Sequence, residues 1–201
     1  RTRQRIKTKY CDKTKMIVIG ITGSLASGKS TVAKLIAKKK YPLFSADKVV
    51  LDLYKNSRFI DLIIKKFKLS SKIKIKKQIK SIIIKNNSNL LALESIVHPI
   101  VRKKMNNFLK IRTKIKILEI PLLIENKLKK HFDKIIFVDT KEPLRLKRYL
   151  RRNGDKDMFD ILNKKQISSA NKKKACNLTI NNNYSLAILK ENVKKFMKIY
   201  E

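Results

Sequence analysis

The chain has 201 residues and a formal net charge of +36, because 51 Lys and Arg side chains outnumber 15 Asp and Glu. The apolar share of 43% is enough for a folded domain and excludes a disordered chain, and no apolar run approaches the roughly 18 residues of a membrane span. Two widely separated Cys residues form no paired motif, which excludes a disulfide scaffold and predicts reduced thiols in a cytoplasmic protein.

The large positive charge has two explanations. A basic chain attracts phosphate-bearing ligands and nucleic acids through its long-range field. The excess is mostly Lys, however, and comes with much Ile and Asn, whose codons are also rich in A and T, so a biased genome explains the composition without a partner. We therefore expect no specific nucleic-acid partner.

The first fifteen residues differ from the rest of the chain. They contain seven basic side chains, one acid and no apolar period. We expect residues 1–15 to be a basic extension, disordered unless bound, and residues 16–201 to form a single domain.

Short apolar runs alternate with helical patterns along this domain. Residues 16–20 form a continuous apolar run typical of a strand buried on both faces, and further short strands are expected over 42–45, 115–120, 135–138 and 178–180. Helical patterns follow the first run and recur over 62–93, 90–108, 144–150 and a terminal stripe of Leu186, Leu189, Val193, Phe196 and Tyr200. Pro99 lies inside the stripe over 90–108, so a kink or break is expected there. The alternation predicts an α/β domain with a parallel sheet.

A phosphate-binding motif follows the first strand. Gly23, Gly28, Lys29 and Ser30 fit the pattern G-x-x-x-x-G-K-S/T, between a buried strand and a helix. The glycines let backbone N–H groups turn toward an anion, the helix adds the positive end of its dipole, and Lys29 places a cation against the outer phosphates. The Ser30 hydroxyl suits a Mg²⁺ ion that bridges those phosphates. We therefore predict ATP and Mg²⁺ as ligands of Gly23, Ser24, Leu25, Ala26, Ser27, Gly28, Lys29, Ser30 and Thr31.

The motif does not fix the reaction, because kinases, ATPases and GTPases share it. The chain has no N-K-x-D guanine motif and is short for a helicase or a motor. A small kinase is therefore favoured, with a kinase of nucleosides or nucleotides among the alternatives. An ATP-dependent nucleic-acid-binding protein is a further alternative, although aromatic residues make up only 7% and do not interleave with the basic runs.

Five further segments resemble those of the dephospho-CoA kinase family, in the same order. They are Ser45-Ala46-Asp47 where the family has Asp-Ala-Asp, Leu93-Glu94 to His98-Pro99, Glu119 to Glu125 around Pro-Leu-Leu, the lid pattern Arg148, Arg152, Gly154 and Gln166, and Ala175 to Asn181 with Cys176 in place of Asp. The resemblance runs from Met16 to near the C-terminus.

The resemblance implies a fold and a reaction. The fold is a three-layer α/β/α nucleotide-kinase domain with a five-stranded parallel sheet, a core of residues 16–51 and 113–201, a helical substrate lobe over about 52–112 and a small lid over about 148–166. The reaction is phosphorylation of the ribose 3′-hydroxyl of dephospho-CoA by ATP, which gives CoA and ADP. We expect a cytoplasmic monomer whose partner is this small molecule.

The resemblance also suggests roles, each beside a simpler structural one. Asp47 is expected to act as base or to orient the hydroxyl, or else to cap the next helix. Arg148 and Arg152, four apart on one helix face, are expected to neutralise the transferring phosphoryl group, or else to form a solvated basic face. Lys29 completes the expected catalytic residues, which are Asp47, Lys29, Arg148 and Arg152.

The remaining expected site residues are less distinctive. His98 is either a structural polar contact or a substrate contact, and Glu119 holds Mg²⁺ through water or caps a helix. The other expected contacts are Leu122 and Leu123, which line the pantetheine path or fill the core, Glu125 on the substrate side, and Asn181 beside the nucleotide.

Overall fold

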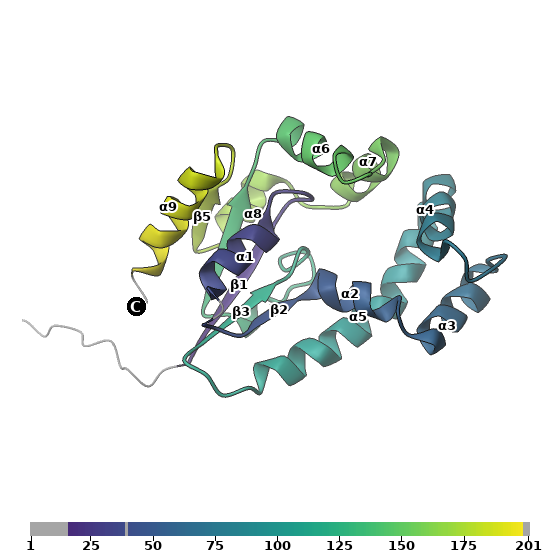
Figure 1. Cartoon of the computed structure of the whole chain (residues 1–201), viewed down its shortest axis with the longest axis horizontal. Coiled ribbons are helices and arrows are strands. Elements are labelled where there is room, and N and C mark those ends of the chain that lie inside the picture. The colour runs from purple at the N-terminus through teal and green to yellow at the C-terminus, as the bar shows by residue number, and fades with distance from the viewer. Residues whose placement is uncertain (1–15, 39, 199–201) are drawn as a thin grey trace, which may run out of the picture.

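A five-stranded, fully parallel sheet forms the centre of the molecule (Figure 1). The structure is a computed structural model and describes residues 16–38 and 40–198. Its strands are β1 (Ile17–Gly23), β2 (Leu43–Ser45), β3 (Ile115–Glu119), β4 (Lys134–Asp139) and β5 (Leu178–Asn181), in the spatial order β2-β3-β1-β4-β5. All five expected strands are present. The expected basic extension over 1–15 and Tyr200 lie outside the described residues.

The strand order determines where a ligand can bind. β1 lies at the centre, with β3 on one side and β4 on the other. Open parallel sheets bind ligands beyond the carboxyl ends of their strands, where the strand order reverses. The ends of β1, β2 and β3 therefore share one edge, and the register places Ser45 beside Glu119 and Gly23 beside Val138.

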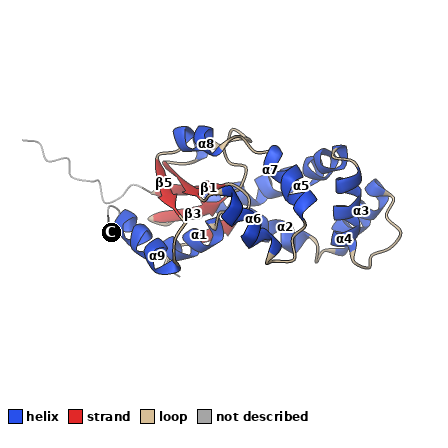
Figure 2. Ribbon diagram, turned by 90° about the horizontal axis from the view of Figure 1, so that it is seen from above, coloured by secondary structure: helices blue, strands red, loops and turns tan. Residues whose placement is uncertain are grey.

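Helices cover both faces of the sheet, which gives the expected three layers (Figure 2). On one face α1 (Lys29–Ala37) and α9 (Leu186–Met197) pack against the side chains of Ile19, Ile21 and neighbouring strand residues. On the other face α8 (Ser169–Ala175) lies against β4, and the second half of α5 (Ser88–Leu109) packs on Leu118 and Ile135. Successive strand residues point to opposite faces, so a strand buried on both faces reads as a continuous apolar run.

A second apolar core lies beside the sheet domain, among α2 (Ala46–Leu53), α3 (Ser57–Phe67), α4 (Ile75–Lys85) and the first half of α5. Figure 1 shows α3 and α4 at the far end of the molecule from α9. The stretch 62–93, expected to be helical, comprises the end of α3, all of α4 and the start of α5, with a loop over 68–74. The buried side chains of α3 and α4 include Phe59, Ile63, Ile75, Ile79 and Ile83. Their lysines lie mainly on the outer faces.

The expected break at Pro99 does not occur, because α5 runs as one helix from Ser88 to Leu109. Proline removes one intrahelical hydrogen bond. Buried residues on both sides of it, Val97 in the second core and Met105 under the sheet, pack the two halves into one helix. Packing of an apolar face therefore outweighs the lost bond.

A pair of short helices overhangs the carboxyl edge of the sheet. They are α6 (Glu142–Leu150) and α7 (Lys156–Lys164), joined by the expected turn at Asn153 and Gly154. Met158, Ile161 and Leu162 of α7 pack against the second core, so this overhang contacts the helical region as well as the sheet domain. A 3₁₀ turn, Lys129–His131, leads into β4. Of the described helices, none combines the length and apolar character required to cross a membrane.

Candidate active site

The loop after β1 leads directly into α1, as the motif predicts. Gly28 has φ +92°, in the left-handed region, and a Cβ atom there would lie 2.3 Å from the Asn182 amide nitrogen. Only glycine combines this backbone angle with this close approach. Asn182 donates to the Ser27 carbonyl at 2.8 Å and fixes the loop from β5.

Lys29 begins α1 and is almost fully buried. Its Nζ donates to the carbonyl of Ser24 at 3.0 Å, inside its own loop. Burial lowers its pKa from 10.5 to about 8, although the carboxylates of Asp47 and Glu119 oppose that change. A buried cation without a directly bonded carboxylate is suited to a phosphate group.

Three buried polar atoms near the loop have no hydrogen-bond partner among the described residues: Ser27 Oγ, Arg145 Nε and Arg148 Nη1. Arg148 Nη1 would lie 3.9 Å from a Cβ atom added at Gly28. Unpaired buried donors are costly in a folded protein. Ser27 belongs to the phosphate-binding loop, and both arginines belong to α6 beside it.

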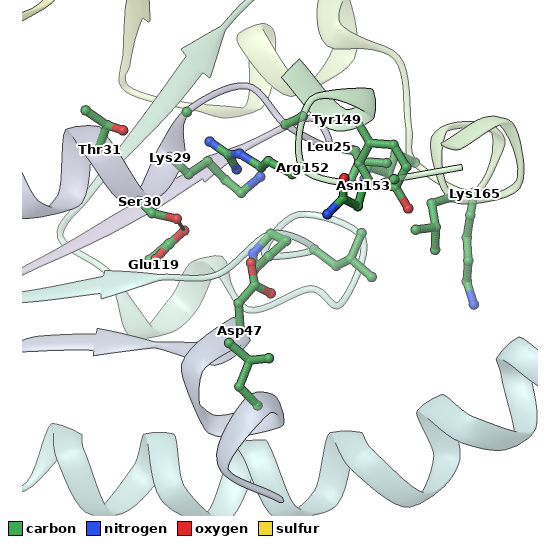
Figure 3. A pocket seen from close by; sticks show the side chains of 18 of the residues that line it. Leu25, Lys29, Ser30, Thr31, Asp47, Glu119, Tyr149, Arg152, Asn153 and Lys165 are labelled. Carbon is green, nitrogen blue, oxygen red and sulfur yellow. Dashed lines mark hydrogen bonds between the residues drawn. The ribbon is translucent and has the colours of Figure 1, made fainter. Parts of the chain in front are cut away.

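Ser30 and Glu119 face each other across the mouth of the loop (Figure 3). The Ser30 hydroxyl donates to Glu119 Oε1 at 2.5 Å, and Glu119 is 2% exposed at the end of β3. Hydroxyl and carboxylate oxygens are the donor types that Mg²⁺ prefers. The described residues contain no cluster of three or more His, Cys, Asp or Glu that could hold a metal alone. The pair therefore suits an ion that takes its other ligands from phosphates and water.

Asp47 lies in the first turn of α2 and points toward Lys29 (Figure 3). The cap of α2 is Ser45, whose hydroxyl accepts from the Lys48 amide at 3.4 Å. The capping alternative for Asp47 is therefore wrong. Surrounding protein displaces water from the Asp47 carboxylate and raises its pKa, while Lys29 acts in the opposite direction.

Two cavities meet beside Asp47. The P-loop cleft, of about 720 Å³, is lined by the phosphate-binding loop, Asp47, Glu119, Arg152 and Gln166 among others. The apolar pocket, of about 390 Å³, lies between α2 and α5. Five residues border both cavities: Asp47, Glu94, Pro121, Leu122 and Leu162. A group in one cavity can thus meet a group in the other at Asp47.

The two arginines of the expected lid take different places. Helix α6 ends at Leu150, so Arg152 lies in the following turn and the expectation of one shared helix face is wrong. Arg152 lines the P-loop cleft and points toward Lys29 (Figure 3). Arg148 donates through Nη2 to the carbonyl of Asn182 at 2.9 Å and does not line the P-loop cleft.

Three expected contacts occupy other positions. Leu123 is completely buried in the core under Gly20 and lines neither cavity, whereas Leu122 lines both. Glu125 forms an ion pair with Lys172 at 2.8 Å, away from both cavities. The side chain of Asn181 accepts from Asn183, and its neighbour Asn182 contacts the loop instead. A one-residue change along a strand moves a side chain to the opposite face, which explains the difference.

His98 lines the apolar pocket from α5, where burial lowers its pKa. Sequence reasoning missed Arg145, which is buried and joins the loop to the overhang. It donates to the Leu25 carbonyl at 3.3 Å and to Asn163 Oδ1 at 2.9 Å. Among many basic residues, nothing in the sequence distinguishes this arginine.

Comparison with known proteins identifies the family. The family model described as dephospho-CoA kinase matches residues 17–187. The chain belongs to the dephospho-CoA kinase family. Its members include the Bartonella henselae dephospho-CoA kinase, 34% identical over 89% of this chain and 95% of that protein. The Fusobacterium nucleatum dephospho-CoA kinase is 32% identical over 90% of this chain and 97% of that protein.

Solved structures agree with this membership. The dephospho-CoA kinase from Campylobacter jejuni superimposes with a TM-score of 0.65 at 26% identity, covering 91% of this chain and 96% of that one. A shikimate kinase from Acinetobacter baumannii shares the fold, with a TM-score of 0.54 at 14% identity, covering 93% of this chain and 94% of that one. Membership makes the chain a kinase, and the resemblance and the fold class read from the sequence are confirmed.

Proposed function

We propose that the protein transfers the γ-phosphoryl group of ATP to the ribose 3′-hydroxyl of dephospho-CoA, with CoA and ADP as products. Family membership supports the reaction. The observation that carries the proposal is the position of Asp47, where a phosphate-binding cleft meets an apolar pocket. That arrangement suits a polyphosphate donor and an acceptor with a long, weakly polar arm.

The P-loop cleft holds ATP in this proposal. Backbone N–H groups from Ser24 to Thr31, with Lys29, bind the outer phosphates. Ser30 and Glu119 would hold Mg²⁺, which when bound neutralises charge on the β- and γ-phosphates.

The apolar pocket holds the acceptor. Its walls include Val97, Val101, Met105 and Leu122, which suit the pantetheine arm. His98 and Arg102 supply polar groups on the same wall. The helical region over about 52–112 thus acts as the substrate lobe.

Asp47 performs the proton transfer. Its carboxylate accepts the proton of the 3′-hydroxyl as that oxygen bonds to the γ-phosphorus and the bond to the ADP oxygen breaks. Lys29 and Arg152 stabilise the negative charge on the transferring group. The overhang of α6 and α7 acts as a lid that excludes water and suppresses ATP hydrolysis.

The test is ADP release from Mg·ATP by the purified protein. Dephospho-CoA, AMP and adenosine are compared as acceptors, and CoA is measured in parallel. ADP formation that requires dephospho-CoA and equals CoA formation is expected. Equal ADP release with every acceptor, or with AMP or adenosine alone, would contradict the proposal, and stimulation by RNA would favour a nucleic-acid-binding protein.

A further inference from the structure

Lys172 is a lysine with a completely buried side chain on α8, outside the catalytic set. Its ammonium donates to Gln166 Oε1 at 2.9 Å and pairs with Glu125 Oε1 at 2.8 Å. A buried ammonium is costly unless it is paired and hydrogen-bonded. Both bonds lead to the segments that flank the P-loop cleft.

Gln166 follows α7 and lines the P-loop cleft. An amide presents an acceptor oxygen on one side and two N–H donors on the other. Lysine can only donate, so Lys172 fixes the oxygen of Gln166 on its own side. The amide nitrogen then faces away from Lys172, and no described residue accepts a hydrogen bond from it.

The same cluster fixes the backbone around Gln166. Glu125 Oε1 also accepts from the amide of Ile167 at 3.3 Å. Two residues further on, Ser169 Oγ lies 3.3 Å from Ser24 Oγ of the phosphate-binding loop. The segment 166–169 is thus attached both to that loop and to the segment that carries Leu122.

We propose that Gln166 binds ATP by donating its amide N–H to a nucleotide oxygen, and that Lys172 is the positioning residue that holds the amide in this orientation. Glu125 balances the charge of Lys172 and fixes the adjoining backbone. This proposal rests on one part of the proposed function, the binding of ATP in the P-loop cleft, and does not depend on the acceptor.

The experiment measures binding of a non-hydrolysable ATP analogue with Mg²⁺ by calorimetry, without an acceptor. Gln166→Glu keeps an oxygen for Lys172 but replaces the donor with a carboxylate that repels phosphate. We expect its Kd to rise at least about tenfold, as for a hydrogen bond to a charged group. Gln166→Ala loses the donor without repulsion and is expected to show a smaller increase.

Lys172→Met tests the positioning role. Without the ammonium, the Gln166 amide is free to turn its oxygen toward the cleft, so the Kd for the analogue rises. In the double variant with Gln166→Ala, Lys172→Met has almost no further effect on the Kd. In turnover, KM for ATP rises and KM for dephospho-CoA stays at the wild-type value. The matched control is Lys173→Met, because Lys173 is the exposed neighbour on the same helix.

Lys172→Met leaves Glu125 without its cation and can destabilise the fold, so Glu125→Gln with Lys172→Met is measured beside it. Wild-type affinity in Gln166→Ala would overturn the proposal, and this variant leaves the Lys172–Glu125 pair intact. Weakened folding with unchanged affinity in the Lys172 variants would make Lys172 purely structural. Gln166-dependent ATP binding in a protein that does not phosphorylate dephospho-CoA would overturn the proposed function alone.

Discussion

Asp47 combines three properties that an acid–base residue needs. It borders both cavities, it points toward Lys29, and its pKa is raised by the surrounding protein. Ser45 forms the helix cap, so the carboxylate of Asp47 is not used to hold α2. Ser45, at the position where the resemblance implies an acid, therefore has a structural role in this chain.

Asp47→Asn should lower kcat by at least about 10²-fold, because a positioned acid–base group contributes that much and an amide cannot accept the proton. Initial rates of CoA formation measure the effect. The matched control is Asp52→Asn, an exposed carboxylate of the same helix that pairs with Lys55 at 2.7 Å. Near-normal turnover in the Asp47 variant would refute its role.

Two ionisations should bound the pH dependence of kcat/KM for ATP. Lys29 binds phosphate while protonated, and its pKa in the free protein is about 8, so kcat/KM should fall as the pH rises above that value. Asp47 accepts a proton only when ionised, so kcat/KM should also fall as the pH drops through its raised pKa. An alkaline limit near 10.5, the ordinary lysine value, would contradict the environment assigned to Lys29.

Arg152 is the arginine placed to act on the transferring group. Arg152→Met should lower kcat by about 10³-fold, the low end for an arginine that stabilises this charge, with a smaller effect on ATP affinity. Single-turnover rates and analogue binding separate the two effects. Arg151→Met, a change at the adjacent exposed position, serves as control, and unchanged kcat in the Arg152 variant would leave Arg152 as surface charge.

Among the elements, the helices of the substrate lobe carry no sequence motif for most of their length, and their stability depends on packing. Their apolar residues form a core separate from the sheet, and Ile63 at its centre is completely buried. Ile63→Ala should reduce the free energy of unfolding by about 2–5 kcal/mol through a cavity. Ile73→Ala, at a position that is 72% exposed, should change it by no more than about 0.5 kcal/mol in urea titrations. Equal losses of unfolding free energy in the two variants would contradict a separate apolar core centred on Ile63.

The sequence predicted those features that depend on local pattern. The strand, loop and helix around Gly28 and Lys29 are contiguous, and β1 has a continuous apolar run. Contacts between distant segments were not predictable. The pair of Glu125 and Lys172 joins residues 47 positions apart by number, and Asn182 meets Ser27 across 155. At Pro99 the expected break is absent, because local propensity ignores the packing on either side.

In the whole molecule, the charge of +36 acts on association rather than on fold. The kcat/KM for ATP should fall several-fold between about 0.05 and 0.5 M salt while kcat changes little, because salt screens long-range attraction and leaves the closed site unaffected. Rate measurements over that range test this. A kcat that falls in parallel would place the salt effect in the chemical step instead.

The lid and the lobe are joined in this structure. Lys165 pairs with Glu94 where the two cavities meet, and Lys80 of α4 pairs with Asp155 of the lid at 3.4 Å. With the packing of Leu162 on the lobe core, these contacts place the acceptor pocket and the lid side by side. In the proposed reaction, an acceptor in the apolar pocket contacts Leu162 of α7, which borders the P-loop cleft as well.

The most direct test of the whole account is the product itself. Dephospho-CoA and Mg·ATP are incubated with the protein, and the product is examined by ³¹P NMR. A new phosphomonoester at the ribose 3′ position, formed in equal amount to ADP and absent with Asp47→Asn, is the predicted result. Unchanged dephospho-CoA, or phosphate transferred to water alone, would contradict the account.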